Sequence, residues 1–396
     1  MPERTLPRTE AVHVAIAPSL AAIERGQWNA LVGPDNFYNS RPWLRGLEIA
    51  HGEGPVVTAS LGGRLLGALP TWPGERDAPG LFHLSGLAAG IEVDRPADYL
   101  WLGARRSVFN ELVCVRGPLR GVTLRALLRG ALGLAASCGA AGVVMPYLSA
   151  DDARELADAH PGARALLHDA DANLDVPPGG FEELLAAAGQ HDRTRRRAEL
   201  RACARGGTAV EWSPLGARAA REAAYLVTQN RARYGGTADV GWMERSFAAQ
   251  RASGVLDQAI GCFGLRDGRP VAVTVCYRHH DRLYARYYGF DYRRSRPACE
   301  YFALTYCAPV DFAAAHGLRR YRLAVSAPEL KVRRGAVLDP LGAVLLPLDA
   351  PVAGREVIDA LNARTVRRWR DRCRTRQHAL GAAWDGWEAG RSATTA

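Results

Sequence analysis

Lysine is nearly absent from this sequence. The chain has 396 residues and 51 lysine and arginine side chains together, of which Lys331 is the only lysine. A phosphate-binding loop of the GxxxxGK[ST] type requires a lysine, and the chain has none in that setting. No GxGxxG segment follows an expected strand either. Nucleotide-dependent phosphoryl transfer and a doubly wound dinucleotide-binding fold are therefore disfavoured.

Long apolar runs and paired cysteines are also missing. No run approaches the ~18 apolar residues that cross a bilayer. The first 20 residues lack the apolar stretch of a signal peptide, so export is not expected. The eight cysteines form no CxxC pair and no metal-ligand spacing with histidine. We expect a cytoplasmic protein with no membrane span and no metal site.

Positive charge is in excess, with a formal net charge of +10. Such an excess favours an anionic partner, for example a nucleic acid. The use of arginine in place of lysine is typical of a GC-rich genome, but that replacement leaves the sign of the charge unchanged. An RNA or another polyanion is thus one interpretation, and a merely basic surface is the other.

The second half of the chain has the clearest pattern. Period-2 alternation with turn residues between the runs predicts a three-strand antiparallel meander over 258–290. A helix is expected over 298–317, ending at a glycine and kinked at Pro309. A further strand is expected over 319–325.

The first half gives a similar order of elements. We expect a hairpin over 55–72, a helix over 122–139 and a strand over 140–148. Between the two halves, 181–205 and 216–234 have helical patterns, and the first of these is basic in its second half.

These patterns predict the domain organisation. A chain of this length favours two domains, and the VPPGG segment at 176–180 is typical of a hinge. We expect one domain over 1–175, a second over 176–355 and a basic helix and tail over 356–396. The fold class is α/β (α+β), with a mixed, largely antiparallel central sheet in each domain, flanked by helices.

One passage is similar to a known family. Residues 287–336 read YYGFDYRRSRPACEYFALTYCAPVDFAAAHGLRRYRLAVSAPELKVRRGA, in which a helix, a GL pair, a strand, a lysine and a glycine follow one another. This passage resembles the Fem-type (FemABX-like) branch of the GNAT acyltransferase superfamily. Looser similarity to the same branch is found in 193–212, 229–247 and 37–48.

The resemblance implies a fold and an activity. It implies tandem GNAT-like domains and transfer of an acyl or aminoacyl group, often from aminoacyl-tRNA, to an amine of a small molecule or peptide. In this branch such transfer serves cell-wall or peptide natural-product assembly. It implies no metal, no redox cofactor and no DNA partner, and it assigns the acyl-transfer site to the second domain.

The sequence departs from CoA-dependent GNAT proteins at the loop before the 298–317 helix. Those proteins have an (R/Q)-x-x-G-x-(G/A) loop, whose glycines let backbone N–H groups approach a pyrophosphate. Here 293–298 reads RRSRPA. Arg293, Arg294 and Arg296 suit phosphates through their side chains instead. This difference favours aminoacyl-tRNA as the donor, with acyl-CoA as the alternative.

Lys331 matches the lysine of the family passage. Amide formation requires stabilisation of a tetrahedral oxyanion, and an ammonium is a compact point charge that can also change its pKa when it is buried. We expect Lys331 to stabilise that oxyanion or to orient the donor ester. The alternative is a lysine on a solvated loop with no special role.

Other candidates flank the same passage. Tyr287 and Tyr288 end the third meander strand, where the GNAT fold seats the acyl group, and adjacent strand residues face opposite ways. We expect Tyr288 to pass a proton and Tyr287 to contact substrate. Asp291 is a candidate proton acceptor and Glu300 a substrate-binding carboxylate, although each could simply pair with an arginine.

Two further groups complete the expected site. By resemblance, Arg231 and Tyr234 border the acceptor pocket. Four arginines are candidates for binding donor phosphate or RNA: Arg193, Arg197, Arg201 and Arg333. The first three share one helical face. A solvated helix face is the alternative for that stripe. Two other functions remain open, a CoA-dependent N-acyltransferase on the same fold and a non-catalytic RNA-binding protein.

Overall fold

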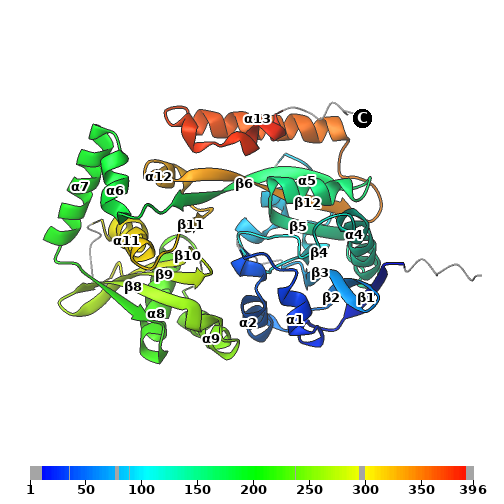
Figure 1. Ribbon diagram of the computed structural model, residues 1–396, viewed down its shortest axis with the longest axis horizontal. Helices are drawn as coiled ribbons and strands as arrows, with labels where there is room; N and C mark the ends of the chain where they lie inside the picture. The colour runs from blue at the N-terminus through cyan, green and yellow to red at the C-terminus, as the bar shows by residue number, and fades with distance from the viewer. Residues whose placement is uncertain are drawn as a thin grey trace, which may run out of the picture. The chain divides into compact units, whose positions relative to one another are not determined.

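The structure is a computed structural model that describes residues 11–34, 36–75, 80–88, 90–236, 238–293 and 299–388. The chain forms two compact units (Figure 1). Unit 1 comprises the residues up to Arg41, Glu53–Leu166 and Gly342–Ile358, and unit 2 comprises Pro42–Gly52, Leu167–Leu341 and the residues from Asp359 onward. Within the described ranges, no helix has both the length and the apolar character needed to cross a membrane.

Unit 1 is built on a sheet with the strand order β1-β2-β3-β4-β5. The strands are β1 (His13–Ala17), β2 (Val56–Leu61), β3 (Arg64–Pro73), β4 (Tyr99–Leu102) and β5 (Gly142–Ser149). The first four are antiparallel to their neighbours, and β5 is parallel to β4. Since parallel neighbours need a crossover, α4 (Arg120–Ser137) connects β4 to β5 and packs on the sheet. The shorter helices are α1 (Arg25–Asn29), α3 (Leu84–Leu87) and α5 (Ala150–Asp158).

Unit 2 repeats this plan with more strands. Its order is β6-β11-β10-β9-β8-β7, with β12 beside β6. The strands are β6 (Arg164–Asp175), β7 (Ala209–Pro214), β8 (Ala259–Arg266), β9 (Arg269–His279), β10 (Arg282–Phe290), β11 (Arg320–Ala324) and β12 (Val337–Pro347). Of these, β6 belongs to unit 2 from Leu167 onward and β12 as far as Leu341. The β8–β10 meander is antiparallel, and β11 is parallel to β10. The meander, the following helix and the parallel strand confirm the predicted order.

Helices cover both faces of this sheet. They are α2 (Arg41–His51), α6 (Gly180–Ala187), α7 (Gln190–Arg205), α8 (Ala217–Arg233), α9 (Val240–Ala252), α10 (Glu300–Phe302), α11 (Ala308–Ala315), α12 (Pro328–Val332) and α13 (Arg355–Arg372). A Cβ on Gly289 would lie 2.5 Å from the backbone of α8, whereas Phe290, on the opposite face of β10, clusters with Leu304. Most of α2 belongs to this unit, because Trp43 packs edge-on against Tyr277, with the ring centroids 5.6 Å apart.

The helix after β10 contains an irregular turn just before Pro309, the residue at which the sequence predicts a kink. A π-helical turn, Ala303–Cys307, separates α10 from α11, and Pro309 lies in the first turn of α11. Proline has no N–H to donate to the Thr305 carbonyl four residues earlier. The buried Tyr321 hydroxyl of β11 donates to that carbonyl at 2.8 Å instead, and thereby joins the helix to the strand.

Several expectations were wrong in detail. The pattern over 181–205 predicts one helix, but the structure has two, α6 and α7, because Ala188 takes an extended conformation and Gly189 caps the start of the second. The tail is not one long helix: α13 ends at Arg372, and the buried Trp384 then donates its indole N–H to the Leu338 carbonyl at 2.8 Å. Neither β6 nor β12 was anticipated. The mixed α/β class is confirmed, and the boundaries at 175 and 355 stay predictions.

Candidate active site

The central feature of unit 2 is a divergence of two parallel strands. β10 and β11 pair only over Arg282–Tyr284 and Arg320–Arg322. Beyond this point each strand has an irregularity in its pairing on the other side, β10 between Ala285 and Tyr287 and β11 between Arg322 and Ala324. Bulges re-aim side chains and end pairing, and they are common next to active sites. The strands therefore stop pairing at the place where the sequence predicts the acyl group.

Tyr287 and Tyr288 face opposite sides of β10, as the strand period requires. The Tyr287 ring packs edge-on against Phe247 of α9, and its hydroxyl lies 3.4 Å from the Gln250 amide nitrogen. The Tyr288 ring packs edge-on against Tyr301 of α10, with the centroids 4.8 Å apart. Burial raises the pKa of Tyr288 far above its usual value, so its phenol stays protonated near neutral pH.

Both predicted carboxylates are buried and already bonded. Asp291 accepts hydrogen bonds from the Tyr225 hydroxyl and the Arg293 backbone N–H, each at 3.0 Å. Glu300 forms an ion pair with Arg266 and accepts a hydrogen bond from the Thr208 hydroxyl at 3.0 Å. For Glu300 the arrangement is the arginine pairing that was the alternative interpretation.

The predicted acceptor residues lie at the C-terminal end of α8. The Arg231 guanidinium stacks over the Trp242 ring, 4.5 Å from its centroid. Tyr234 is 77% exposed. Burial, together with the neighbouring Tyr234, raises the pKa of Tyr292 to about 12. Tyr234 and Tyr292 also contribute to the raised pKa of Tyr288, which places these phenols in one neighbourhood.

Lys331 lies in α12, directly after the bulged end of β11. Its side chain is 2% exposed. The Nζ atom donates to the carbonyls of Leu323 at 2.5 Å and Ala324 at 2.7 Å. Ala324 has a left-handed backbone, with φ of +61°, at the bulge where β11 leaves its regular pairing with β6. The single lysine thus binds the carbonyls of the strand end at the divergence.

The charge on Lys331 depends on its surroundings. Burial lowers the pKa of Lys331 to about 7, and Asp171 and Asp169 oppose part of that effect. A neutral amine has two N–H groups, the number that the two carbonyls accept, whereas an ammonium has a third. Both forms are therefore compatible with the contacts to β11.

A buried polar cluster beside Lys331 was missed by the sequence analysis. Asp171 of β6 accepts two hydrogen bonds from the Arg322 guanidinium of β11, at 2.9 and 2.5 Å. Asn173 donates to Asp339 of β12 at 2.8 Å. Burial raises the pKa of Asp169 to about 6. The period-2 spacing of Asp169, Asp171 and Asn173 between apolar residues was the available signal, but this polar segment does not resemble a strand.

The predicted cationic residues have different settings. Arg197, Arg201, Arg293 and Arg333 are exposed. Arg193 donates to the Ala186 carbonyl at 3.2 Å. Arg294 and Arg296 lie outside the described residues.

The arginine helix contacts the turn that follows Lys331. Arg196 of α7 is buried and donates to the Arg333 carbonyl at 2.9 Å. Arg334 pairs with Glu199 of α7 and stacks over Tyr306, 5.1 Å from the ring centroid. The structure therefore brings the arginine helix against the Lys331 turn, while Tyr288 contacts α10. Among the described residues, no three His, Cys, Asp or Glu side chains are grouped closely enough to share a metal ion.

Solved structures share this fold. The crystal structure of FemX superposes with a TM-score of 0.56 at 13% identity, covering 83% of this chain and 96% of that one. A tandem GNAT protein from the clavulanic acid biosynthesis pathway gives 0.51 at 13% identity, covering 87% and 99%. A conserved protein of unknown function from Bacteroides thetaiotaomicron VPI-5482 gives 0.53 at 12% identity, covering 85% and 100%.

A family match accompanies the structural likeness. No curated protein sequence is significantly similar to the chain. Residues 114–341 match the FemAB-like family, which is described as peptidoglycan biosynthesis or recognition. That match spans more than half of the chain and includes most of unit 2. The chain belongs to the FemAB-like family.

Proposed function

We propose that unit 2 transfers an aminoacyl group from aminoacyl-tRNA to an amine of a small molecule or peptide and so forms an amide bond. The observation that supports this most is the divergence of β10 and β11, with the only lysine of the chain bonded to the end of β11. The family description favours an acceptor related to peptidoglycan or a similar peptide.

The chemistry requires few groups. The amine nitrogen attacks the ester carbonyl, a tetrahedral oxyanion forms, and the C–O bond to the ribose then breaks. The amine loses a proton and the leaving ribose hydroxyl gains one, so the step needs no oxidant or metal. Lys331 supplies the third N–H of its ammonium to the oxyanion, because its other two are held by the carbonyls of Leu323 and Ala324.

Proton transfer is assigned to residues of β10 and its end. Tyr288 keeps its proton near neutral pH and is the proposed donor of a proton to the leaving oxygen. Asp291 is the proposed acceptor of the amine proton, either directly or through a water molecule. Tyr225 and the Arg293 N–H orient its two carboxylate oxygens.

Acceptor binding is assigned to the exposed end of α8. Tyr234 and Arg231 present an aromatic ring and a guanidinium there, which suit a peptide or a carboxylate. Tyr287 completes the proposed substrate-binding set. Glu300 is assigned a positioning role, because its ion pair with Arg266 holds the start of α10 in place.

The carrier is proposed to be tRNA. The exposed arginines of α7 lie on the helix whose other residues bond the Lys331 turn. A row of arginines binds an RNA backbone through charge, and such binding weakens steeply as salt rises. The donor-binding set is Arg193, Arg197, Arg201, Arg293, Arg294, Arg296 and Arg333. Acyl-CoA remains the alternative carrier, and no resident cofactor is proposed.

Product formation from charged tRNA tests this function. The protein is incubated with total tRNA carrying ¹⁴C-labelled amino acids and with a pool of peptidoglycan precursors and small peptides. We expect labelled amides whose formation is lost when the tRNA is digested with RNase beforehand.

Two other results would each replace the proposal. Product that forms from acyl-CoA with release of free thiol, and is indifferent to RNase, would assign a CoA-dependent N-acyltransferase. Tight, salt-sensitive RNA binding without product from either donor would assign a non-catalytic RNA-binding protein.

A further inference from the structure

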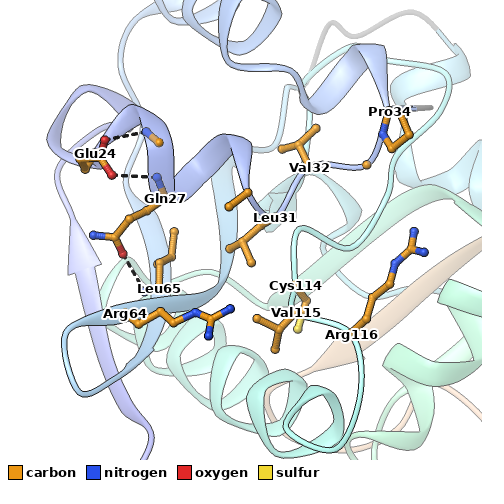
Figure 2. Close-up of a pocket in the computed structure, with 13 residues that line it drawn as sticks. Glu24, Gln27, Leu31, Val32, Pro34, Arg64, Leu65, Cys114, Val115 and Arg116 are labelled. Atoms are coloured by element: carbon orange, nitrogen blue, oxygen red, sulfur yellow. Dashed lines mark hydrogen bonds between the residues drawn. The ribbon is translucent and has the colours of Figure 1, made fainter. Parts of the chain in front are cut away.

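Unit 1 contains a pocket that lies apart from every residue assigned above. Its volume is about 670 Å³, within the range typical of small-molecule sites. The wall is formed by three chain segments: residues 24–34, which include α1, residues 64–65 at the start of β3, and residues 114–116, which precede α4 (Figure 2).

Hydrogen bonds tie the three segments together, so the pocket is preformed. The Gln27 side-chain oxygen accepts the backbone N–H of Leu65 at 2.7 Å, which joins the first segment to β3. The Val115 N–H donates to the Leu66 carbonyl at 2.7 Å, which joins the third segment to the same strand. The wall of the pocket is therefore formed before a ligand binds.

The lining combines an apolar surface with two cations. Leu31, Val32 and Val115 are partly exposed to the pocket opening. The side chains of Arg64 and Arg116 extend on either side of Leu31 and Val115 in Figure 2.

These two arginines differ from others in the unit. Arg105 and Arg106 share Glu75, and Arg120 pairs with Asp152 and Glu155. In the described part of the chain, neither Arg64 nor Arg116 forms a salt bridge.

The one acidic residue of the lining does not neutralise them. Both carboxylate oxygens of Glu24 accept backbone N–H groups, from Gly26 at 2.7 Å and Gln27 at 2.8 Å. These bonds lower the pKa of Glu24, so the carboxylate stays ionised while it caps α1. The charged side chains of the pocket are thus those of Arg64, Arg116 and Glu24, and the Glu24 carboxylate is already hydrogen-bonded to the backbone of α1.

We propose that this pocket of unit 1 binds a small amphipathic anion, in which a carboxylate or phosphate group contacts Arg64 and Arg116 and an apolar chain or ring covers Leu31, Val32 and Val115. Arginine is suited to such anions because its planar guanidinium donates in pairs. The apolar part contributes by covering surface that is now open to water. This site does not depend on the proposed acyl transfer.

Octanoate, octanol and acetate distinguish the two contributions. Their binding to the full chain is measured by isothermal titration calorimetry at low salt. We expect octanoate to bind about tenfold or more tightly than octanol, which lacks the anion, and than acetate, which lacks the apolar chain. Equal binding of octanoate and octanol, or of octanoate and acetate, would overturn the proposal.

A charge-matched pair of double variants locates the site. The variant Arg64→Gln/Arg116→Gln is expected to bind octanoate about tenfold or more weakly, because both ligand cations are lost. The control Arg125→Gln/Arg129→Gln removes two exposed arginines from α4 and is expected to bind like the wild type.

Leu31→Glu is a second, independent variant that places a carboxylate on the apolar surface, and it too is expected to lose octanoate. All these positions are at least partly exposed, so circular dichroism should show folded proteins. Wild-type octanoate binding in the Arg64/Arg116 variant, or an equal loss in the Arg125/Arg129 control, would refute the assignment.

Discussion

At the scale of single residues, the structure gives the lone lysine an unusual environment. A lysine on a surface loop has three donors in water, whereas Lys331 is buried and holds two backbone carbonyls at the bulged end of β11. The sequence predicted that this residue is special because of its uniqueness and its family passage. It could not predict the burial, since the carbonyls of Leu323 and Ala324 are presented to the ammonium at the bulge where β11 leaves its pairing with β6, a strand distant in the chain.

Lys331 should titrate near neutral pH. Because the chain has one lysine, protein labelled with ¹³C-lysine gives one lysine spin system that needs no assignment. We expect its ¹³Cε shift to report a pKa of about 7 in place of 10.5, because burial disfavours the charged form. A titration near 10.5 would show a solvated ammonium and would refute the proposed environment.

The same shift predicts how stability depends on pH. Between pH 7 and 10.5 the unfolded chain holds a proton on Lys331 that the folded chain has released. The free energy of unfolding therefore rises with pH across this window. Urea titrations of the wild type should show the rise, and Lys331→Met should lack that part of it. An identical pH dependence in both proteins would contradict the expectation.

Asp171 is expected to matter for stability more than an exposed carboxylate does. Asp171→Asn leaves the buried Arg322 guanidinium without its anion and should cost about 3 kcal/mol in the free energy of unfolding. Asp239→Asn, which breaks the exposed pair with Arg245, should cost less than about 1 kcal/mol. Equal losses in urea denaturation would show that the β6–β11 pair is not a buried ion pair.

At the scale of elements, sequence patterns predicted those strands and helices whose formation depends on residues close together in the chain. The β8–β10 meander has runs of apolar and aromatic residues with turn residues between them, so its three strands were predictable. β6 was not, because RALLHDADANLD has polar residues at positions that other strands fill with apolar ones. Its Asp171 side chain accepts hydrogen bonds from Arg322 of β11, and its Asn173 amide donates to Asp339 of β12. Partners remote in sequence thus make an otherwise unfavourable strand stable.

The split of the 181–205 region has a comparable reason. The helical period continues across Ala188 and Gly189, but the Ala188 backbone turns to an extended conformation and α7 starts afresh after Gly189. At Pro309, by contrast, the sequence did indicate an irregular helix, because the missing N–H is a local property.

Tyr321 and Pro309 should be energetically coupled. Tyr321→Phe removes the donor to the Thr305 carbonyl and should cost about 1 kcal/mol. Pro309→Ala restores an N–H that can reach that carbonyl, so Tyr321→Phe should cost less in this background. A double-mutant cycle by urea denaturation measures the coupling, expected at about 1 kcal/mol. Strictly additive effects would show that the hydroxyl does not substitute for the missing helical bond.

At the scale of the whole molecule, the two units have a similar order of strands and helices but differ in the functional side chains that these elements carry. Each has antiparallel strands, a crossover helix and a strand parallel to the last one. Among the residues that the structure describes, unit 2 combines the divergence of β10 and β11 with a lysine, buried carboxylates and an arginine helix. The tandem architecture was predictable from the order of elements, whereas the polar cluster around Lys331 depends on contacts between β6, β11 and β12.

The central claim is that Lys331 stabilises the transition state of an acyl transfer in unit 2. The most direct measurement is single-turnover transfer of ¹⁴C-aminoacyl groups from charged tRNA to the amine pool by the wild type, Lys331→Arg and Lys331→Met. Near-ultraviolet circular dichroism confirms that each variant is folded. We predict that Lys331→Met lowers the rate about 100-fold or more, as loss of an oxyanion donor does. Lys331→Arg should also be slow, because the planar guanidinium does not fit the two carbonyl contacts. A folded Lys331→Met protein that transfers at the wild-type rate would contradict the account.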